Sequence, residues 1–231
     1  MCSIIAANRQ SDLDLAFLEN RDRPKELFIG NDVRKIGDVV GVYDYRAKGI
    51  AAGYSIRSDT AGGVANVLGY SGSKSRGVLL LNALQEGRSA RDVVRIIKKE
   101  VKNGEHSSAI YVICDRKSII NIESFGTKVY ESQNREKKKL VVTTNHFHHL
   151  EGGMRLKNSV LREKYLNRLG SVTEKNVLKL ATRHRNPAIC RHGRTLASFA
   201  VFKRPSDKKP RIFYSVQEPC KGYTEFKNSS S

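Results

Sequence analysis

The 231-residue chain contains no tryptophan, and aromatic residues make up only 7% of it. A surface that binds single-stranded nucleic acid by stacking needs aromatic side chains interleaved with its basic ones, and the basic runs of this chain lack them. Helix-turn-helix, zinc-finger and RNA-recognition patterns are also missing. We therefore expect no specific nucleic-acid partner.

Long apolar runs are absent as well. Runs such as Ile4–Ala7 and Val78–Leu81 are far short of the roughly 20 residues that a membrane-spanning helix needs. No basic segment followed by a long apolar one opens the sequence, which argues against a secretory signal. We expect a chain without a membrane span that works in the cytoplasm.

Cysteine is scarce and has no metal-binding spacing. The four cysteines stand at positions 2, 114, 190 and 220, without any Cys-x-x-Cys pair. Cys190 and Cys220 could pair or simply be buried, and the sequence leaves this open. The glycine-rich segments match neither nucleotide-binding pattern, so we expect no phosphate loop.

Three histidines crowd together at His146, His148 and His149, and imidazole is the commonest metal ligand. Adjacent residues of a strand point to opposite faces, and no Asp or Cys lies nearby in the sequence to complete a site. We expect neither a metal nor another cofactor.

Acidic residues are few relative to basic ones. The chain has 42 Lys and Arg against 23 Asp and Glu, a net charge of +19, and residues 128–212 hold 21 of the basic but only 6 of the acidic residues. Such a surface suits a polyanion, whether nucleic acid, anionic lipid or a phosphorylated substrate. The simpler alternative is a solvated basic surface.

Short apolar or alternating runs predict strands, and helical periodicity predicts two pairs of helices inserted between strand groups. The predicted strands are Ser3–Asn8, Leu13–Leu18, Val39–Tyr45, Ile50–Ile56, Gly63–Leu68, Ala109–Cys114, Ser118–Ser124, Lys128–Glu131, Leu140–Thr144, Thr195–Phe202, Ile212–Val216 and Gly222–Phe226. Ser89 is expected to cap the second helix. This order favours an α+β fold with antiparallel sheets covered by helix pairs over a parallel, doubly wound sheet. No repeat or linker divides residues 1–231, so we expect one domain. The predicted helices are Arg76–Gln85, Ala90–Val101, Asn158–Leu169 and Thr173–Ala181.

Cys2 is the residue with the most chemical potential. A small side chain after Met1 is what methionine aminopeptidases accept, so we expect Met1 to be removed and Cys2 to become the first residue. Its thiol and α-amine would then titrate near pH ~8.5 and ~7.7–8, so one residue would carry both nucleophile and base. The alternative is a small buried residue at the start of a strand.

Four short motifs accompany Cys2. An Asp can hold an α-amine by a hydrogen bond, and an Arg beside a thiol lowers its pKa. An Asn at a strand end can donate to an oxyanion without supplying a proton that must be recovered. The motifs are Asn20-Arg21-Asp22, Gly63-Val64-Ala65-Asn66, Thr143-Thr144-Asn145-His146 and Ile189-Cys190-Arg191.

Taken together and in this order, the motifs resemble the cysteine-type N-terminal-nucleophile hydrolases. The chain is most similar to the branch of isopenicillin N acyltransferase and its prokaryotic relatives, and it lies near the NRDE (transport-and-Golgi-organisation) family. The resemblance runs over nearly the whole chain and includes Thr195-Leu196-Ala197-Ser198-Phe199 and Glu218-Pro219-Cys220. It implies a four-layer αββα sandwich.

The resemblance also implies roles for individual residues. Cys2 would be the nucleophile, Asp22 would orient its α-amine, and Asn145 would complete the oxyanion hole. Asn66 would position the substrate or the oxyanion, and Arg191 would stabilise the thiolate or hold the substrate. Arg21 and Asn20 would contact the substrate.

One departure from the pattern concerns the position three residues before Asp22. The bile-acid and penicillin V hydrolase branch has an Arg there, whereas this chain has Glu19. The pKa-lowering role would then pass to Arg21 or Arg191, and the sequence leaves both open.

The expected function is that of an amidohydrolase or acyltransferase, which cleaves a non-peptide C–N bond through a thioester. Its partner would be a small-molecule amide or acyl donor, and a homo-oligomer is possible. One alternative is a non-catalytic binding or trafficking protein of the same fold, as in the NRDE relatives. Another is a basic surface that binds nucleic acid or anionic lipid.

Overall fold

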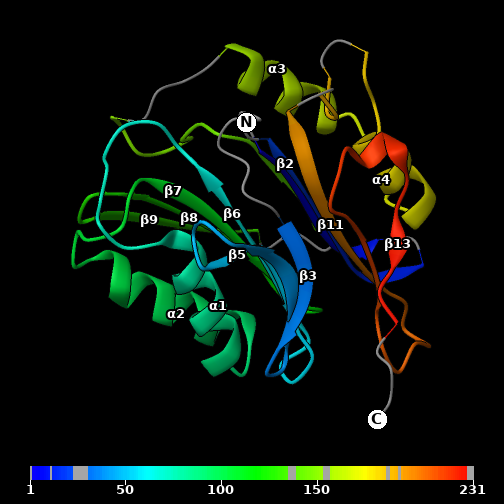
Figure 1. The fold of residues 1–231 in the computed structure, drawn as a ribbon, viewed down its shortest axis with the longest axis horizontal. Coiled ribbons are helices and arrows are strands. Elements are labelled where there is room, and N and C mark those ends of the chain that lie inside the picture. Colours follow the sequence, from blue (N-terminus) through cyan, green and yellow to red (C-terminus); the bar gives the residue numbers. More distant parts are fainter. Residues whose placement is uncertain are drawn as a thin grey trace.

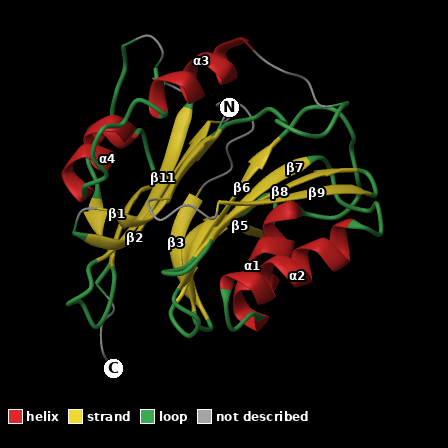
Figure 2. Ribbon diagram, turned by 180° about the vertical axis from the view of Figure 1, so that it is seen from behind, coloured by secondary structure: helices red, strands yellow, loops and turns green. Residues whose placement is uncertain are grey.

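The computed structural model describes residues 2–10, 12–22, 31–134, 139–152, 157–185, 188–191 and 194–227. Met1, whose removal the sequence predicts, lies outside them. Two antiparallel sheets face one another, and a pair of helices covers the outer face of each (Figures 1 and 2). The predicted α+β architecture is therefore confirmed.

The first sheet has six strands in the order β10-β1-β2-β11-β12-β13. Its strand β1 pairs with β10 on one side and with β2 on the other, so the first strand of the chain lies inside the sheet. The strands are β1 (Ser3–Gln10), β2 (Leu13–Asp22), β10 (Lys139–Thr143), β11 (Thr195–Lys203), β12 (Arg211–Ser215) and β13 (Thr224–Glu225).

The second sheet has seven strands that follow one another in chain order from β3 to β9. The sequence predicted all of them except β3, which forms one edge of the sheet. The strands are β3 (Asn31–Ile36), β4 (Val39–Asp44), β5 (Gly49–Ser55), β6 (Thr60–Asn66), β7 (Ala109–Cys114), β8 (Ile119–Phe125) and β9 (Lys128–Asn134).

Three apolar layers separate these four structural layers. One lies between the sheets, one between the seven-stranded sheet and helices α1 and α2, and one between the six-stranded sheet and helices α3 and α4. Strands β5 and β7 are buried on both faces, as a sandwich of this kind requires. The helices are α1 (Arg76–Glu86), α2 (Ala90–Val101), α3 (Lys157–Leu166) and α4 (Glu174–Ala181).

Hydroxyl caps begin the helices that cover the seven-stranded sheet. The Oγ of Ser75 accepts from the backbone N–H of Val78, and Ser89 caps α2 as predicted. The start of α1 presses directly on the start of β5, because a Cβ at Gly49 would lie only 2.3 Å from the backbone of Gly77. This close approach fixes where the first turn of α1 points.

Helices long and apolar enough to cross a bilayer are absent from the described part of the chain.

Candidate active site

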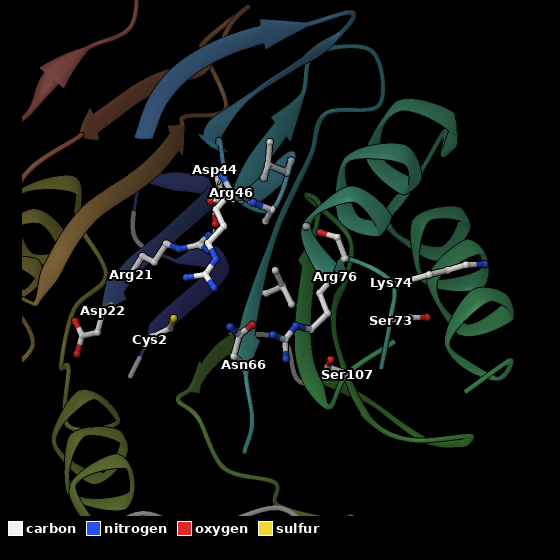
Figure 3. A pocket seen from close by; sticks show the side chains of 15 residues that line it. Cys2, Arg21, Asp22, Asp44, Arg46, Asn66, Ser73, Lys74, Arg76 and Ser107 are labelled. Carbon is white, nitrogen blue, oxygen red and sulfur yellow. Dashed lines mark hydrogen bonds and ion pairs between the residues drawn. The ribbon is translucent and has the colours of Figure 1, made fainter. Parts of the chain in front are cut away.

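A cavity of about 300 Å³ opens where the start of β1 meets the first turn of α1. Figure 3 shows Cys2 and Arg21 on one side of it and Arg76 on the other, with Asn66 between them. The lining comes from both sheets and from α1: Cys2, Arg21, Asp22, Asp44, Arg46, Ala47, Ile50, Val64, Asn66, Ser73, Lys74, Ser75, Arg76, Gly77 and Ser107. The structure thus brings together four residues that the sequence singled out, Cys2, Arg21, Asp22 and Asn66.

Cys2 lies at the entry to β1 and is 6% exposed. The pairing of β1 with β2 matches Ser3 with Asn20, so the same register continued by one residue sets Cys2 opposite Arg21. Burial raises the pKa of the Cys2 thiol, and the charge of Glu19 raises it further. Arg21 acts in the opposite direction, because a guanidinium favours the thiolate.

Asp22 belongs to a buried network beside Cys2. Its Oδ1 accepts from the hydroxyl of Thr195 at 2.6 Å, and its Oδ2 accepts from the guanidinium of Arg162 on α3 at 3.1 Å. A guanidinium nitrogen of Arg191 lies 3.9 Å from the same Oδ2. These partners hold the carboxylate at the edge of the cavity, where it can accept a hydrogen bond from an amine.

Arg21 is fixed by a second acidic residue. Its guanidinium lies 2.5 Å from Oδ2 of Asp44, whose Oδ1 accepts the backbone N–H groups of Arg46 and Ala47. Arg191 interacts with Asp22 and does not line the cavity. Of the two arginines that the sequence left open for supporting the thiolate, the geometry favours Arg21.

The opposite wall of the cavity is cationic. Arg76 is the first residue of α1 and Lys74 precedes its N-cap Ser75, so both lie at the helix start, where free N–H groups add a partial positive charge. Arg76 donates to the carbonyl of Ser108 at 2.8 Å, and burial lowers the pKa of its guanidinium. No carboxylate of the described residues lies within 4.0 Å of Arg76. Its charge is therefore available to a ligand.

Asn66 and Asn145 meet at the floor of the site. The side-chain amide of Asn145 donates to the backbone carbonyl of Asn66 at 2.5 Å, and its backbone N–H donates to Oγ of Ser159. Asn145 does not itself line the cavity, although the register of β1 with β10, in which Ile4 pairs with Thr143, runs on to set Asn145 opposite Cys2. One of its two side-chain N–H bonds is taken by Asn66.

Asn20, expected to contact the substrate, lies elsewhere. It is fully buried, and its amide donates to the carbonyl of Ala181 at 2.8 Å while its oxygen accepts from the hydroxyl of Ser198 at 2.6 Å. Alternate residues of a strand face opposite sides of the sheet, so Arg21 points into the cavity and Asn20 points toward α4. The geometry gives Asn20 a structural position and does not support substrate contact.

Five charged residues of the site were missed as site residues by the sequence reasoning: Asp44, Arg46, Lys74, Arg76 and Arg162. Arg162 is 2% exposed, and it reaches Asp22 from 140 positions further along the chain. Arg46 lies in a turn and Lys74 in the segment before α1, where a basic residue is ordinary. No local pattern distinguishes them.

Glu19 is a further group that sequence reasoning noted only as a departure. It is 1% exposed and lies between the two sheets, where burial raises its pKa to about 8 against the opposing influence of Arg21. A Cβ at Gly63 would lie 2.7 Å from its Oε2, so the glycine makes room for the carboxyl group. The signal was present in the alternation of β2, which turns Phe17, Glu19 and Arg21 to the same face.

The histidine cluster is completed by a residue distant in sequence. Oε2 of Glu163 on α3 lies 3.4 Å from Nε2 of His146 and 3.2 Å from Nε2 of His148. His149 instead stacks on Tyr130, with ring centroids 4.0 Å apart. His146, His148 and Glu163 together offer donors that could hold a metal ion.

Comparison with known proteins adds little. No family model matches the chain, and no curated protein matches it. A crystal structure of a Silicibacter pomeroyi protein, described by the family model DUF1028, resembles the chain with a TM-score of 0.39 and 10% identity, over 94% of this chain and 82% of that one. A likeness of this degree carries no argument about function.

Proposed function

We propose that the protein is an N-terminal-nucleophile amidase or acyltransferase, in which Cys2 attacks a non-peptide C–N bond of a small molecule that carries an anionic group. The observation that supports this most directly is the position of Cys2. It lies at the entry to an internal strand and opens into a cavity between the Asp22 network and the cationic first turn of α1. The proposal requires cleavage of the peptide bond before Cys2.

The first half of the reaction makes a thioester. The thiol proton of Cys2 passes to its own α-amine as Sγ attacks the amide carbonyl carbon, and the carbonyl electron pair moves onto oxygen. Collapse of this intermediate restores the carbonyl and breaks the C–N bond, and the leaving amine takes the proton from the α-ammonium. Asp22 accepts a hydrogen bond from the α-amine and so holds it beside the sulfur.

The second half releases the acyl group. Water gives a proton to the α-amine and adds to the thioester carbonyl. Collapse of this intermediate breaks the C–S bond, and the α-ammonium returns its proton to the sulfur, which yields a carboxylic acid and the free thiol. An amine in place of water gives acyl transfer instead. In both halves the oxyanion needs a donor, and the remaining N–H bond of the Asn145 amide and the side chain of Asn66 are the groups that the resemblance provides.

The charges of the cavity narrow the substrate class. Four cations line it against two carboxylates. Arg21 is paired with Asp44 and Lys74 with Glu105, which leaves Arg46 and Arg76 without a carboxylate partner among the described residues. A substrate carboxylate or phosphate beside Arg76 would form a charge-assisted hydrogen bond and lie at a helix N-terminus. A working thiolate also needs a reducing compartment, which supports the cytoplasm as its location.

Mass spectrometry of the intact protein tests the proposal. We expect a chain that begins with Cys2 and that gains the mass of one acyl group when mixed with anionic N-acyl substrates, with hydroxylamine reversing the gain because it cleaves thioesters. Cys2→Ala should gain nothing. Cys114→Ala is the matched control, because burial raises the pKa of that thiol well above its usual range.

Two results would contradict the proposal. One is full turnover by a chain that retains a residue before Cys2, since the α-amine would then be locked in a peptide bond. The other is a cavity that binds anionic amides reversibly with no adduct and no product, which would point to the non-catalytic binding protein.

A further inference from the structure

Three side chains with metal-binding atoms meet outside the active-site cavity. His184 follows α4, Cys190 lies shortly before β11, and Cys220 lies in a short 3₁₀ helix after β12. One ring nitrogen and the two sulfurs all lie within 4.8 Å of one another. Figure 1 shows the red segment that carries Cys220 beside α4. None of the three residues lines the cavity that holds Cys2.

Backbone hydrogen bonds hold the first two ligands in place. The carbonyl of Arg183 accepts from the N–H groups of Ile189 and Cys190, both at 2.9 Å, which closes the loop between His184 and Cys190. The N–H of Lys221 donates to the carbonyl of Glu218 at 2.9 Å and so fixes the turn of Cys220. Backbone hydrogen bonds therefore help to fix the positions of all three side chains.

The tautomer of His184 also suits a metal. Its Nδ1 lies 3.1 Å from the carbonyl oxygen of Cys190, and a carbonyl can only accept, so Nδ1 carries the proton. Nε2 then keeps its lone pair. A ligating histidine whose second nitrogen donates to a backbone carbonyl is the usual arrangement around a bound metal.

We propose that His184, Cys190 and Cys220 form a Zn²⁺ site, with the fourth position of the tetrahedron taken by water. Two thiolates and one imidazole are a donor set that zinc prefers. Zinc holds sulfur at about 2.3 Å and nitrogen at about 2.0 Å, so small side-chain rotations would close the triangle onto the ion.

The exposure of His184 would let Zn²⁺ enter, and burial explains why the Cys190 thiol is protonated. Cys190 is buried, Cys220 is partly buried and His184 is exposed, so the ion would enter from the side of the histidine. Burial raises the pKa of Cys190 to about 12, and both cysteines are free thiols in this structure. Zinc would displace the thiol protons as it binds. A disulfide between Cys190 and Cys220 would not involve the imidazole of His184, whereas a metal site uses all three side chains.

The site would brace the segment that carries Arg191. Arg191 follows Cys190 directly, its N–H donates to Oγ1 of Thr195 at 2.7 Å, and Thr195 in turn donates to Asp22. Zinc would therefore stiffen the polypeptide behind the Asp22 network without touching the reacting atoms. This inference does not depend on the proposed reaction.

Equilibrium dialysis of the reduced full-length protein against Zn²⁺, with metal quantification, tests the site. We expect one Zn²⁺ per chain, and Co²⁺ in its place should give the charge-transfer absorption of thiolate ligands. Cys220→Ser should abolish both signals. His184→Ala should weaken binding by more than the about 10–100-fold that loss of an outer partner costs. Because Cys220 is only partly buried and His184 is exposed, both variants should keep the fold, which circular dichroism checks.

Matched controls separate this site from the other metal-binding candidates. Cys114→Ser and His149→Ala should bind zinc as the unaltered protein does. Zinc retained by Cys220→Ser would overturn the proposal and direct attention to His146, His148 and Glu163. An intact mass lower by two hydrogens in protein purified without reductant, with no zinc bound after reduction, would also overturn it in favour of a disulfide.

Discussion

The two walls of the cavity differ in how their charges are paired. On the wall that carries Cys2, Asp22 is satisfied by Thr195 and Arg162, and Arg21 is satisfied by Asp44. On the opposite wall, Lys74 is paired with Glu105 at 2.5 Å, but Arg76 has no carboxylate partner among the described residues. Paired side chains hold one another in place, whereas the unpaired guanidinium of Arg76 can still bind an anionic group of a ligand. Under the proposed function, the first wall would hold the reacting groups, and Arg76 on the second wall would bind an anionic group of the substrate.

The largest expected effect comes from removing Cys2, the proposed nucleophile on the first wall. Cys2→Ala should abolish turnover, because no other described thiol lines the cavity. The fold should survive, since Ala fits a buried small-residue position. Steady-state assays and thermal unfolding check the two halves of this prediction. Residual turnover above a few per cent would mean that the chemistry does not run through this sulfur.

Breaking the paired wall should cost stability as well as activity. Arg162→Met leaves the buried carboxylate of Asp22 without its closest cation, and loss of one member of a buried pair costs about 3–5 kcal/mol. Urea unfolding measures the loss. The exposed Lys164→Met on the same helix is the control and should change stability by less than about 0.5 kcal/mol. Equal losses in the two variants would show that the ion pair is not what matters.

Removing the unpaired charge of Arg76 should weaken the binding of anionic substrates. Arg76→Met should raise KM for anionic substrates about 10–100-fold, because a hydrogen bond to a charged group contributes about 1.5–3 kcal/mol. Its effect on kcat should be smaller, and neutral analogues of the same substrates should lose little. The exposed Arg95→Met on α2 serves as the control. A loss that is the same for charged and neutral substrates would instead indicate a structural role.

The last expected effect concerns stability alone and the buried Glu19, which lies between the two sheets. Its pKa is raised to about 8 in the folded protein from 4.5, so the folded state keeps a proton that the unfolded chain has lost. Stability should therefore fall as the pH rises between those values, by at most about 1.4 kcal/mol per pH unit from this group. Glu19→Gln should remove this part of the slope, while the exposed Glu151→Gln should leave it unchanged. Urea unfolding across the range decides the matter.

Much of the fold follows from short-range patterns in the sequence. The buried runs of β1, β2, β5 and β7 and the hydroxyl-capped helices are local features, and the structure confirms them. Strand β3 was missed because its sequence, Asn31–Ile36, is mostly polar, as an edge strand with one neighbour can be. Its pairing with β4 is a property of the sheet and leaves little mark on the six residues themselves.

The site was predictable only on the side that carries Cys2. Arg21 and Asp22 lie on β2, and Cys2 directly precedes β1, which pairs with β2 as the next strand of the chain, so their proximity follows from antiparallel pairing of successive strands. The cationic wall depends on how α1 packs on β5, and the Arg162 contact depends on how α3 packs on the other sheet. These are tertiary facts, and no motif of two or three residues encodes them.

The placement of β1 between β10 and β2 has a consequence for how the protein loses activity. Backbone amides of Ile4 to Asn8 are bonded within a sheet interior, so they should exchange with deuterated solvent only when the whole sheet opens. Cys2, which directly precedes that strand, should therefore keep its position for as long as the sheet stays folded. Denaturant should abolish turnover and native structure along one common curve, with no range in which a folded chain has lost its activity.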